Sequence, residues 1–446
     1  NNTISVKRNV IVMGVDIKLS LKNNSNGKAD INVVVDADYF DYLVLPDGTK
    51  VTKSNYTYTV NKNGTYKFTA YSKKGMVKSS SIEVKSIDTT PPSIKKCEAI
   101  FKDNSTTFTI NSNDTDIAKY VVNNNSSQSY TKNSFTISGI IKNANITVYD
   151  KSNNKTTVSC PGYYEQVKPK NTENIKYSEE TETLKVSIEF NKRNSGIDYY
   201  TTYIWVKDAY KQFKSQVPNN YGKERLLPKK LIENAVKDNN LENKLVVGIN
   251  ASGYEGSGKY VNTPAMPLVI SNGKIIRNDT NNSSVSGNYN TYGMTKNGTL
   301  KYYQFKGKNP KNVAQNIFDD GVQNTFGWFY RLVVDGKASY KSNTRSVLQG
   351  ICQINENNFV FITDIYESSR TGFTYTKLGE YMVSLGCQTG YNLDGGGSSA
   401  LYAVVNGKGK LLNEPGGYGY SGERYMANAW MLIPREEETI ATKSEE

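Results

Sequence analysis

A repeat of strand-like segments constrains the fold of the N-terminal third of this chain more than any other feature. Residues 42–44 (Tyr-Leu-Val) match residues 120–122 (Tyr-Val-Val), and residues 68–73 match residues 146–151 at the same spacing. Around these segments, apolar and polar residues alternate in short runs between turn signals such as Pro46-Asp47-Gly48. This is the pattern of antiparallel strands with one buried face. Two copies of one β-sandwich unit are therefore expected.

Length and linker signals divide the rest of the chain. At 446 residues, it is too long for a single hydrophobic core, so several domains are expected. Residues 87–92 (Ile-Asp-Thr-Thr-Pro-Pro) resemble the connector between tandem bacterial Ig-like modules. The predicted fold class is multidomain, with two all-β Ig-like sandwiches followed by an α+β domain of mixed sheet and helices. The expected boundaries are sandwiches at 1–88 and 91–160, a proline-bearing linker at 161–172, the α+β domain at 173–436 and a disordered tail at 437–446.

The periodicity of apolar residues in the third domain predicts both strands and helices. Residues 183–190 and 358–363 alternate like strands, and three helical patterns stand out. Pro228 begins the first helix, Asn309 caps the second, and Gly386 ends the third. The apolar stripe of the third helix consists of Leu378, Tyr381, Met382 and Leu385. Such stripes are expected to pack against the core.

Composition excludes several classes of function. The chain contains no histidine, which excludes Ser-His-Asp and Cys-His catalysis and His-ligated zinc. Its net charge of +13 is spread evenly, since residues 1–165 carry 21 Lys and Arg against 14 Asp and Glu and the remainder carries 34 against 28. No basic run or motif predicts a nucleic-acid partner. No apolar run is long enough for a transmembrane segment. The charge suits an anionic cell wall, or equally a surface with no specific partner.

Four cysteines allow three disulfide pairings, and none lies in a Cys-x-x-Cys spacing. Cys97 and Cys160 bracket the second predicted sandwich, so a disulfide joining its ends is expected. In the loop-entropy account it would be worth roughly 4 kcal/mol. Cys352 and Cys387 flank the strand and helix that precede a glycine-rich segment, and a second disulfide is favoured there. The alternative is four buried free thiols.

The glycine-rich segment at residues 391–402 is the strongest candidate for a functional site. It sets Asn392 and Asp394 against three consecutive glycines and two serines, between two apolar strand-like runs. Three glycines weaken any strand or helix that contains them, which favours a tight backbone path or a ligand lying on the main chain. The alternative is a glycine-rich hairpin in which Asp394 is an ordinary turn residue.

Residues 392–399 (Asn-Leu-Asp-Gly-Gly-Gly-Ser-Ser) resemble the signature of the phosphodiester glycosidase family. Four other segments resemble those of the family in the same order along residues 175–435, namely 248–251 (Gly-Ile-Asn-Ala), 331–337, 344–346 and 423–428. Three residues depart from the family pattern: Ala251 for Gly, Asn343 for Pro and Tyr425 for Pro. These departures are expected to change the shape of loops more than the chemistry of the site.

The resemblance implies cleavage of the bond between the anomeric carbon of a sugar and a phosphate oxygen. A phosphate monoester leaves without strong protonation, which fits a site without histidine. Asp394 is the expected catalytic carboxylate, as nucleophile or base, with Glu423 as the second carboxylate of the pair. Arg345 and Arg424 are expected to neutralise the phosphate. For Arg424 the alternative is a salt bridge to Glu423.

Substrate contacts are expected from the same family segments. Backbone N–H groups of the three glycines are expected to form an anion-binding nest, aided by the two serine hydroxyls. Asparagine amides would hold sugar hydroxyls or orient the carboxylates. The expected substrate-binding residues are Asn250, Asp364, Asn392, Gly395, Gly396, Gly397, Ser398, Ser399 and Asn428. Aromatic residues considered for stacking on a sugar ring are Tyr254, Trp328, Tyr418 and Tyr420.

The predicted function is a glycoside hydrolase that cleaves the C1–O–phosphate bond of a GlcNAc-like sugar-1-phosphodiester. The substrate would be a cell-wall polymer or glycan, and the protein would be secreted or associated with the cell surface or cell wall. No cofactor is predicted, although Asp and Glu side chains leave a divalent cation as an option. The alternatives are a non-catalytic surface adhesin or carbohydrate-binding protein, and a metal-dependent phosphodiesterase. The sequence leaves the sugar, aglycone, stereochemistry, anchoring and oligomeric state open.

Overall fold

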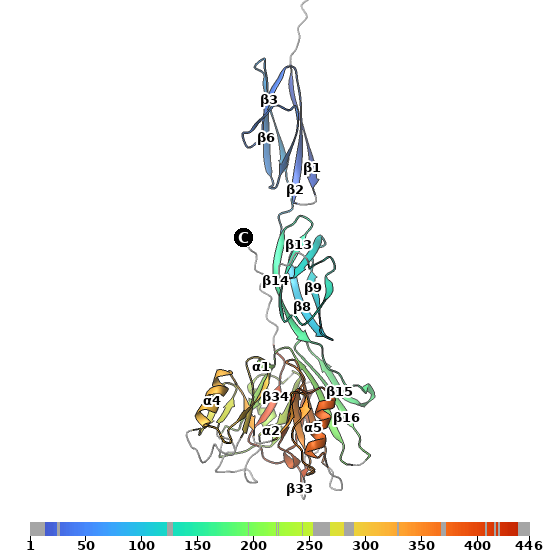
Figure 1. The fold of residues 1–446 in the computed structure, drawn as a ribbon, viewed down its shortest axis with the longest axis vertical. Coiled ribbons are helices and arrows are strands. Elements are labelled where there is room, and N and C mark those ends of the chain that lie inside the picture. Colours follow the sequence, from blue (N-terminus) through green and yellow to red (C-terminus); the bar gives the residue numbers. More distant parts are fainter. Residues whose placement is uncertain are drawn as a thin grey trace, which may run out of the picture. The chain divides into compact units, whose positions relative to one another are not determined.

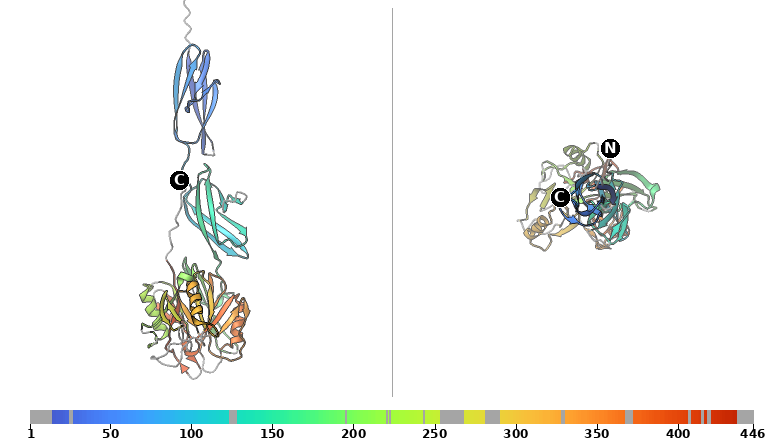
Figure 2. Two further views of the ribbon diagram at one scale, coloured as in Figure 1. Left: turned by 60° about the vertical axis from the view of Figure 1, so that its left-hand side comes forward. Right: turned by 90° about the horizontal axis from the view of Figure 1, so that it is seen from above.

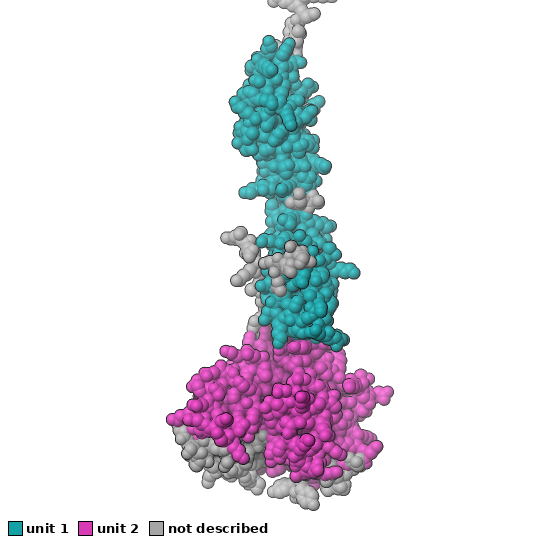
Figure 3. All heavy atoms as spheres, in the orientation of Figure 1, with its two compact units in different colours: residues 1–162, 439–446 teal, residues 163–438 magenta. Residues whose placement is uncertain are grey.

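The structure is a computed structural model that describes residues 14–435 except 25–26, 123–127, 195, 220, 222, 243, 253–267, 281–289, 328–329, 367–371, 406–407, 414–415 and 418–419. The predicted tail at 437–446 lies outside the described residues. Contacts divide the chain into two compact units, residues 1–162 with 439–446, and residues 163–438 (Figure 3). The protein is mostly β, with several sheets and few helices.

The first part of the N-terminal unit contains two antiparallel sheets that share one core (Figures 1 and 2). Its strands are β1 (Val15–Asn24), β2 (Lys28–Ala37), β3 (Phe40–Val44), β4 (Lys50–Val51), β5 (Asn55–Val60), β6 (Gly64–Ser72) and β7 (Val77–Val84). The sheet orders are β1-β2-β5 and β4-β3-β6-β7. Alternation puts every second residue inside, so Ile31 and Val33 of β2 meet Phe68 and Ala70 of β6 in the core.

The second part of this unit forms a seven-stranded arrangement in the order β11-β10-β13-β14-β8-β9-β12. Its strands are β8 (Ile94–Lys102), β9 (Ser105–Ser112), β10 (Ile117–Val122), β11 (Ser129–Tyr130), β12 (Ser134–Ser138), β13 (Asn143–Asp150) and β14 (Lys155–Tyr164). β14 continues past residue 160, so the expected start of the linker falls inside a strand.

Strands that correspond in the sequence repeat occupy corresponding places. β3 pairs with β6 and β6 with β7, and likewise β10 pairs with β13 and β13 with β14. The registers differ by one residue, since Tyr42 pairs with Tyr71 whereas Tyr120 pairs with Val148. Both pairs contain an irregularity at the start of the first strand, between Phe40 and Tyr42 and between Ile117 and Lys119.

The C-terminal unit is built on two large sheets. The first has the order β15-β16-β17-β28-β27-β29-β25-β26 and the second β18-β34-β19-β30-β31. The first contains β15 (Ile175–Glu180), β16 (Leu184–Asn191), β17 (Tyr199–Val206), β25 (Arg331–Val334), β26 (Lys337–Ala338), β27 (Gln349–Gln353), β28 (Asn358–Asp364) and β29 (Thr389–Leu393). The second contains β18 (Phe213–Gln216), β19 (Val246–Asn250), β30 (Leu401–Val405), β31 (Lys408–Leu411) and β34 (Ala429–Leu432).

All strand pairings described in these two sheets are antiparallel. The expectation of a mixed sheet was therefore wrong. α2 joins β18 to β19 and α5 joins β28 to β29, and in each sheet one antiparallel strand lies between the two strands so joined. Smaller pairings complete the unit: β20 (Leu268–Ser271) with β21 (Lys274–Asn278), β22 (Asn290–Met294) with β23 (Leu300–Gln304) and β24 (Thr325–Gly327), and β32 (Gly416–Gly417) with β33 (Tyr420–Ser421).

The helices are α1 (Ala209–Gln212), α2 (Pro228–Asp238), α4 (Pro310–Asp319) and α5 (Tyr375–Ser384), with 3-10 turns η1 (Thr172–Asn174) and η2 (Gly396–Ser398). The three predicted helices are confirmed at the predicted boundaries. Pro228 occupies the first position of α2, the Asn309 side chain accepts from Lys311 N to cap α4, and Gly386 takes a positive φ after α5. No helix among the described residues has the length and apolarity needed to cross a membrane.

The two large sheets face each other across the main core, and a helix covers the outer face of each. Phe359 and Phe361 of β28 enter the core with Val247 of β19, whereas the alternate residues Val360 and Ile362 meet α5. On the other sheet, Val246 packs against α2 through Leu231 and Ile232. The order of layers is therefore α5, eight-stranded sheet, five-stranded sheet, α2.

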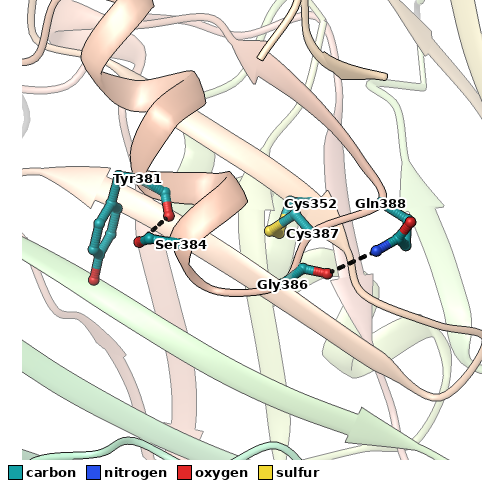
Figure 4. The surroundings of a disulfide bond; sticks show 6 residues. All are labelled: Cys352, Tyr381, Ser384, Gly386, Cys387 and Gln388. Carbon is teal, nitrogen blue, oxygen red and sulfur yellow. Dashed lines mark hydrogen bonds between the residues drawn. A yellow bond between two sulfur atoms is a disulfide. The ribbon is translucent and has the colours of Figure 1, made fainter. Parts of the chain in front are cut away.

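Both predicted disulfides are confirmed. Cys97 of β8 is bonded to Cys160 of β14, with Cα atoms 4.9 Å apart, and Cys352 of β27 is bonded to Cys387, with Cα atoms 5.8 Å apart. Cys387 lies in the turn after α5, where Gly386 O accepts from the Gln388 side chain (Figure 4). The second disulfide therefore joins the segment after α5 to the eight-stranded sheet.

Candidate functional site

The glycine turn, residues 394–400, carries the chain from one large sheet to the other. β29 of the eight-stranded sheet ends at Leu393, and β30 of the five-stranded sheet begins at Leu401. Two glycines are required by geometry: a Cβ on Gly395 would lie 2.2 Å from Val347 O, and Gly396 has a φ of 62°. The turn therefore packs directly on the backbone before β27.

Asp394 lies at the start of this turn and is half-buried. Its Oδ1 accepts from Gly395 N at 3.0 Å, and Ser398 makes a side-chain hydrogen bond to it. Burial raises the pKa of the Asp394 carboxyl, although Ser398, Arg424 and Arg225 act to lower it. The site thus combines a carboxylate partly removed from water with the positive charges of two arginines.

Asn250 fixes both ends of the glycine turn. Its Nδ2 donates to Asp394 O at 2.7 Å and its Oδ1 accepts from Ala400 N at 3.0 Å. Gln349 of β27, which sequence reasoning missed, also donates to Ala400 O at 2.9 Å. Both amides are fully buried, so they orient the turn that carries the carboxylate. The expected role of Asn250 towards the substrate or the carboxylate stays a prediction.

The backbone of the turn corrects the expected anion nest. Gly395 N donates to Asp394 Oδ1, and Gly396 N donates to Val347 O at 2.9 Å. Two of the three glycine amides are thus used within the protein, because the chain must pack tightly on Val347. Ser398 hydrogen-bonds Asp394, and Ser399 Oγ is buried without a hydrogen-bond partner among the described residues.

Arg424 and Arg225 supply positive charge to Asp394. Arg424 donates from an Nη atom to Gly395 O at 3.1 Å, and its backbone N–H donates to Gly397 O at 2.7 Å. Arg225 is only 4% exposed, and sequence reasoning missed it. An isolated antiparallel bridge between Leu226 and Met426 brings the two arginine-bearing segments together. No local pattern around Arg225 signals this burial.

Glu423 occupies a different environment from the one expected. Its Oε1 accepts from Lys229 N at 3.3 Å, in the first turn of α2. Burial raises the pKa of the Glu423 carboxyl, while Lys229 lowers it and Glu233 raises it. A helix N-terminus favours a carboxylate. The structure therefore places Glu423 at the start of α2, without a salt bridge to Arg424 among the described contacts, and its pairing with Asp394 stays a prediction.

Three other expected residues lie around the turn in different states. Arg345 is exposed, and its backbone forms an isolated bridge with Thr374, the N-cap of α5. Asn392 Oδ1 accepts from Tyr330 N at 2.7 Å, and Asn428 Oδ1 accepts from Ser252 N at 2.8 Å. Both asparagines are 1% exposed, so they order backbone segments around the site.

Asp364 is fully buried, which corrects its expected contact with substrate. One carboxylate oxygen accepts from Leu348 N at 3.0 Å and Phe373 N at 3.1 Å. The other lies 3.9 Å from an Nη atom of Arg193. Burial raises the pKa of Asp364 to about 7. Because Leu348 follows the segment on which Gly395 and Gly396 pack, Asp364 supports the turn from behind.

Acidic residues of the C-terminal unit form no group of three within metal-binding distance among the described positions. Such a group occurs in the N-terminal unit, at Asp88, Asp116 and Asp150. Of the aromatic residues considered for sugar stacking, Tyr254, Trp328 and Tyr418 lie outside the described residues, as does the side chain of Tyr420.

Fold and site together define a β-rich domain with a carboxylate and two arginines at a glycine turn. Residues 243–433 match the model of the phosphodiester glycosidase family. The matched region begins just before β19 and ends just after β34. It includes the glycine turn and both Asn250 and Arg424, whereas Arg225 lies outside it.

Two solved structures are similar to the chain. One is the zebrafish N-acetylglucosamine-1-phosphodiester alpha-N-acetylglucosaminidase catalytic domain, auto-inhibited by its pro-peptide, with 15% identity, a TM-score of 0.41, and coverage of 61% of this chain and 87% of that chain. The other is a hypothetical protein from Synechocystis, with 11% identity, a TM-score of 0.37, and coverage of 94% and 92%. No curated protein matches the chain. The likeness to the phosphodiester glycosidase family is therefore the match of residues 243–433 alone.

Proposed function

We propose that the C-terminal unit hydrolyses glycosyl phosphodiesters, cleaving the C1–O–phosphate bond of a GlcNAc-like sugar. The observation that carries this proposal is the half-buried Asp394 at the start of the glycine turn, whose pKa is raised by burial against the lowering effect of the charges of Arg424 and Arg225. Guanidinium groups neutralise phosphate charge, and the carboxylate stabilises or attacks an oxocarbenium-like centre or activates water. A phosphate monoester leaves without a strong acid, which agrees with a chain that contains no histidine.

The proposal also covers the cellular location of the protein and the role of its N-terminal unit. The two disulfides suit an oxidising compartment, such as the cell exterior. The two β parts of the N-terminal unit would act as Ig-like spacers in a secreted or wall-associated protein, and the substrate would be a wall polymer or glycan. Arg345, exposed beside Thr374, would contact the phosphate or aglycone from outside.

The decisive experiment follows hydrolysis of a methyl GlcNAc-α-1-phosphodiester in ¹⁸O-labelled water. Label in free GlcNAc is expected, because water then adds to the anomeric carbon. Asp394→Asn should lower kcat by about 10²- to 10⁴-fold without changing the far-ultraviolet circular dichroism. Asp335→Asn, which removes the same charge from an exposed hairpin position, should retain full activity.

The pH profile provides a second check on the role of Asp394. If the ionised carboxylate acts, kcat falls as the pH drops through a pKa that burial has raised above the ordinary value. Label in the phosphate, with loss of activity in EDTA, would instead support the metal-dependent phosphodiesterase. Binding without turnover by both wild type and Asp394→Asn would support the carbohydrate-binding protein.

A further inference from the structure

Three tyrosines form a cluster beside the glycine turn, defined here as the tyrosine platform: Tyr330, Tyr340 and Tyr375. The rings of Tyr330 and Tyr340 are stacked, with centroids 4.0 Å apart and an interplanar angle of 15°. Tyr375 meets both rings edge-on, at 5.2 Å and 5.7 Å. Tyr340 and Tyr375 are half-buried, but Tyr330 is 45% exposed. Tyr340 covers one face of the Tyr330 ring and Tyr375 lies at its edge, so neither of them covers the opposite face.

The platform is fastened to the strand that carries the candidate carboxylate. Tyr330 N donates to Asn392 Oδ1 at 2.7 Å, and Asn392 N donates to Tyr330 O at 3.2 Å. Asn392 precedes Asp394 by two residues, which corresponds to about 7 Å along a strand. Tyr375 lies between the two sites: burial raises the pKa of its hydroxyl, and Tyr330 and the charge of Asp394 raise it further.

Orientation of the Tyr330 ring is fixed before any ligand arrives. The nearby Tyr330 hydroxyl, together with burial, raises the pKa of Tyr340 to about 12. A rigid aromatic side chain offers contact area at low cost in conformational entropy. Among the described residues of the C-terminal unit, the other exposed large apolar side chains are Ile275 and Ile276, on the separate strand β21.

We infer that the open face of Tyr330 is a sugar subsite, on which the apolar face of a pyranose ring stacks while its anomeric carbon faces Asp394. The inference rests on the proposed function for the identity of the reacting carbon. The tyrosine platform would then bind the glycosyl group of the substrate rather than the aglycone. Aromatic rings with a few convergent polar groups are the usual lining of small-molecule sites.

Binding to the full chain, with Asp394→Asn present to prevent turnover, tests the platform directly. The probes are methyl GlcNAc-α-1-phosphodiester and dimethyl phosphate, measured by titration calorimetry. Adding Tyr330→Ala should weaken the affinity for the sugar probe by about three- to tenfold. The affinity for dimethyl phosphate should stay the same. Tyr330→Phe should bind the sugar probe like tyrosine. Tyr39→Ala is the matched control, at a 60% exposed tyrosine of the N-terminal unit. It should change the affinity for neither probe.

Several results would overturn the subsite: equal affinity of the sugar probe for Tyr330→Ala and its parent, equal weakening of both probes, or no binding of the sugar probe. In wild-type background, Tyr330→Ala should raise KM more than it lowers kcat. The two proposals fail separately. Tyr330-dependent sugar binding without hydrolysis by wild type keeps the subsite and refutes catalysis, whereas hydrolysis with an unchanged KM in Tyr330→Ala keeps catalysis and refutes the subsite.

Discussion

At the scale of single residues, Asp364 links the protonation of the C-terminal unit to its stability. Burial raises its pKa to about 7 from an ordinary value of 3.8, against the opposing effects of Leu348 N, Arg193 and Phe373 N. Between these two values the folded protein keeps a proton that the unfolded chain has lost. The free energy of unfolding therefore falls as pH rises through this window, and the contribution is constant above it.

Asp364→Asn should remove this pH dependence. The free energy of unfolding of wild type should fall, relative to that of the variant, by up to about 1.4 kcal/mol per pH unit between pH 4 and 7. Urea unfolding followed by tryptophan fluorescence reports on the right unit, because Trp205, Trp328 and Trp430 all follow residue 163. Between pH 8 and 9 the two slopes should coincide. Parallel slopes across the whole range would show that Asp364 is ionised in the folded protein.

The sequence predicted the centre of the site better than its surroundings. The run of glycines after Asp394 marks a backbone path that only glycine allows, and Gly395 does approach Val347 O as closely as such a path implies. The burial of Arg225 could not be predicted from the sequence. It depends on a β-bridge between the neighbouring Leu226 and Met426, which lies far along the chain. The contact of Glu423 with the start of α2 escaped prediction for a related reason, because Lys229 lies far from Glu423 in the sequence.

At the scale of secondary-structure elements, the Cys352–Cys387 disulfide joins the end of α5 to β27. α5 also contributes Leu378 and Met382 to the core on the outer face of the eight-stranded sheet. Replacing both cysteines with alanine should lower the free energy of unfolding reported by tryptophan by about 3–4 kcal/mol. The measurement is urea unfolding under non-reducing conditions.

The Cys97–Cys160 disulfide offers a matched control for that prediction. It lies in the N-terminal unit, which contains no tryptophan. Replacing this pair with alanine should leave the tryptophan-detected transition in place. A shift of similar size from both double variants would mean that the two units unfold together, and no shift from Cys352→Ala with Cys387→Ala would remove the disulfide from the stability of the C-terminal unit.

Elements were predictable where local signals decide them. Pro228, Asn309 and Gly386 mark helix ends through backbone chemistry that acts within one turn, and all three helices follow. Sheet type was not predictable in this way. β29 lies between β27 and β25, an order set by core packing across distant segments, and alternation within a strand carries no information about the direction of its neighbour.

At the scale of the whole molecule, the two units have separate cores. The clusters that fill the C-terminal unit draw their buried residues from position 184 onward, and the disulfide within it closes without the N-terminal unit. The chain enters this unit at Tyr163 and Tyr164. Tyr164 N donates to Asn357 Oδ1 at 2.9 Å, and Tyr164 O accepts from Trp205 Nε1 at 2.7 Å.

Residues 163–438 alone should therefore fold and act on a small soluble substrate. Their urea transition and their kcat/KM on methyl GlcNAc-α-1-phosphodiester should equal those of the full chain, because the glycine turn, Arg424 and Arg225 all lie within the fragment. Hydrolysis of the same bond in an insoluble wall preparation should fall, since the proposed spacers are missing. Loss of activity on the soluble substrate by a folded fragment would show instead that the N-terminal unit contributes to the active site, and equal hydrolysis of both substrates would remove the spacer role.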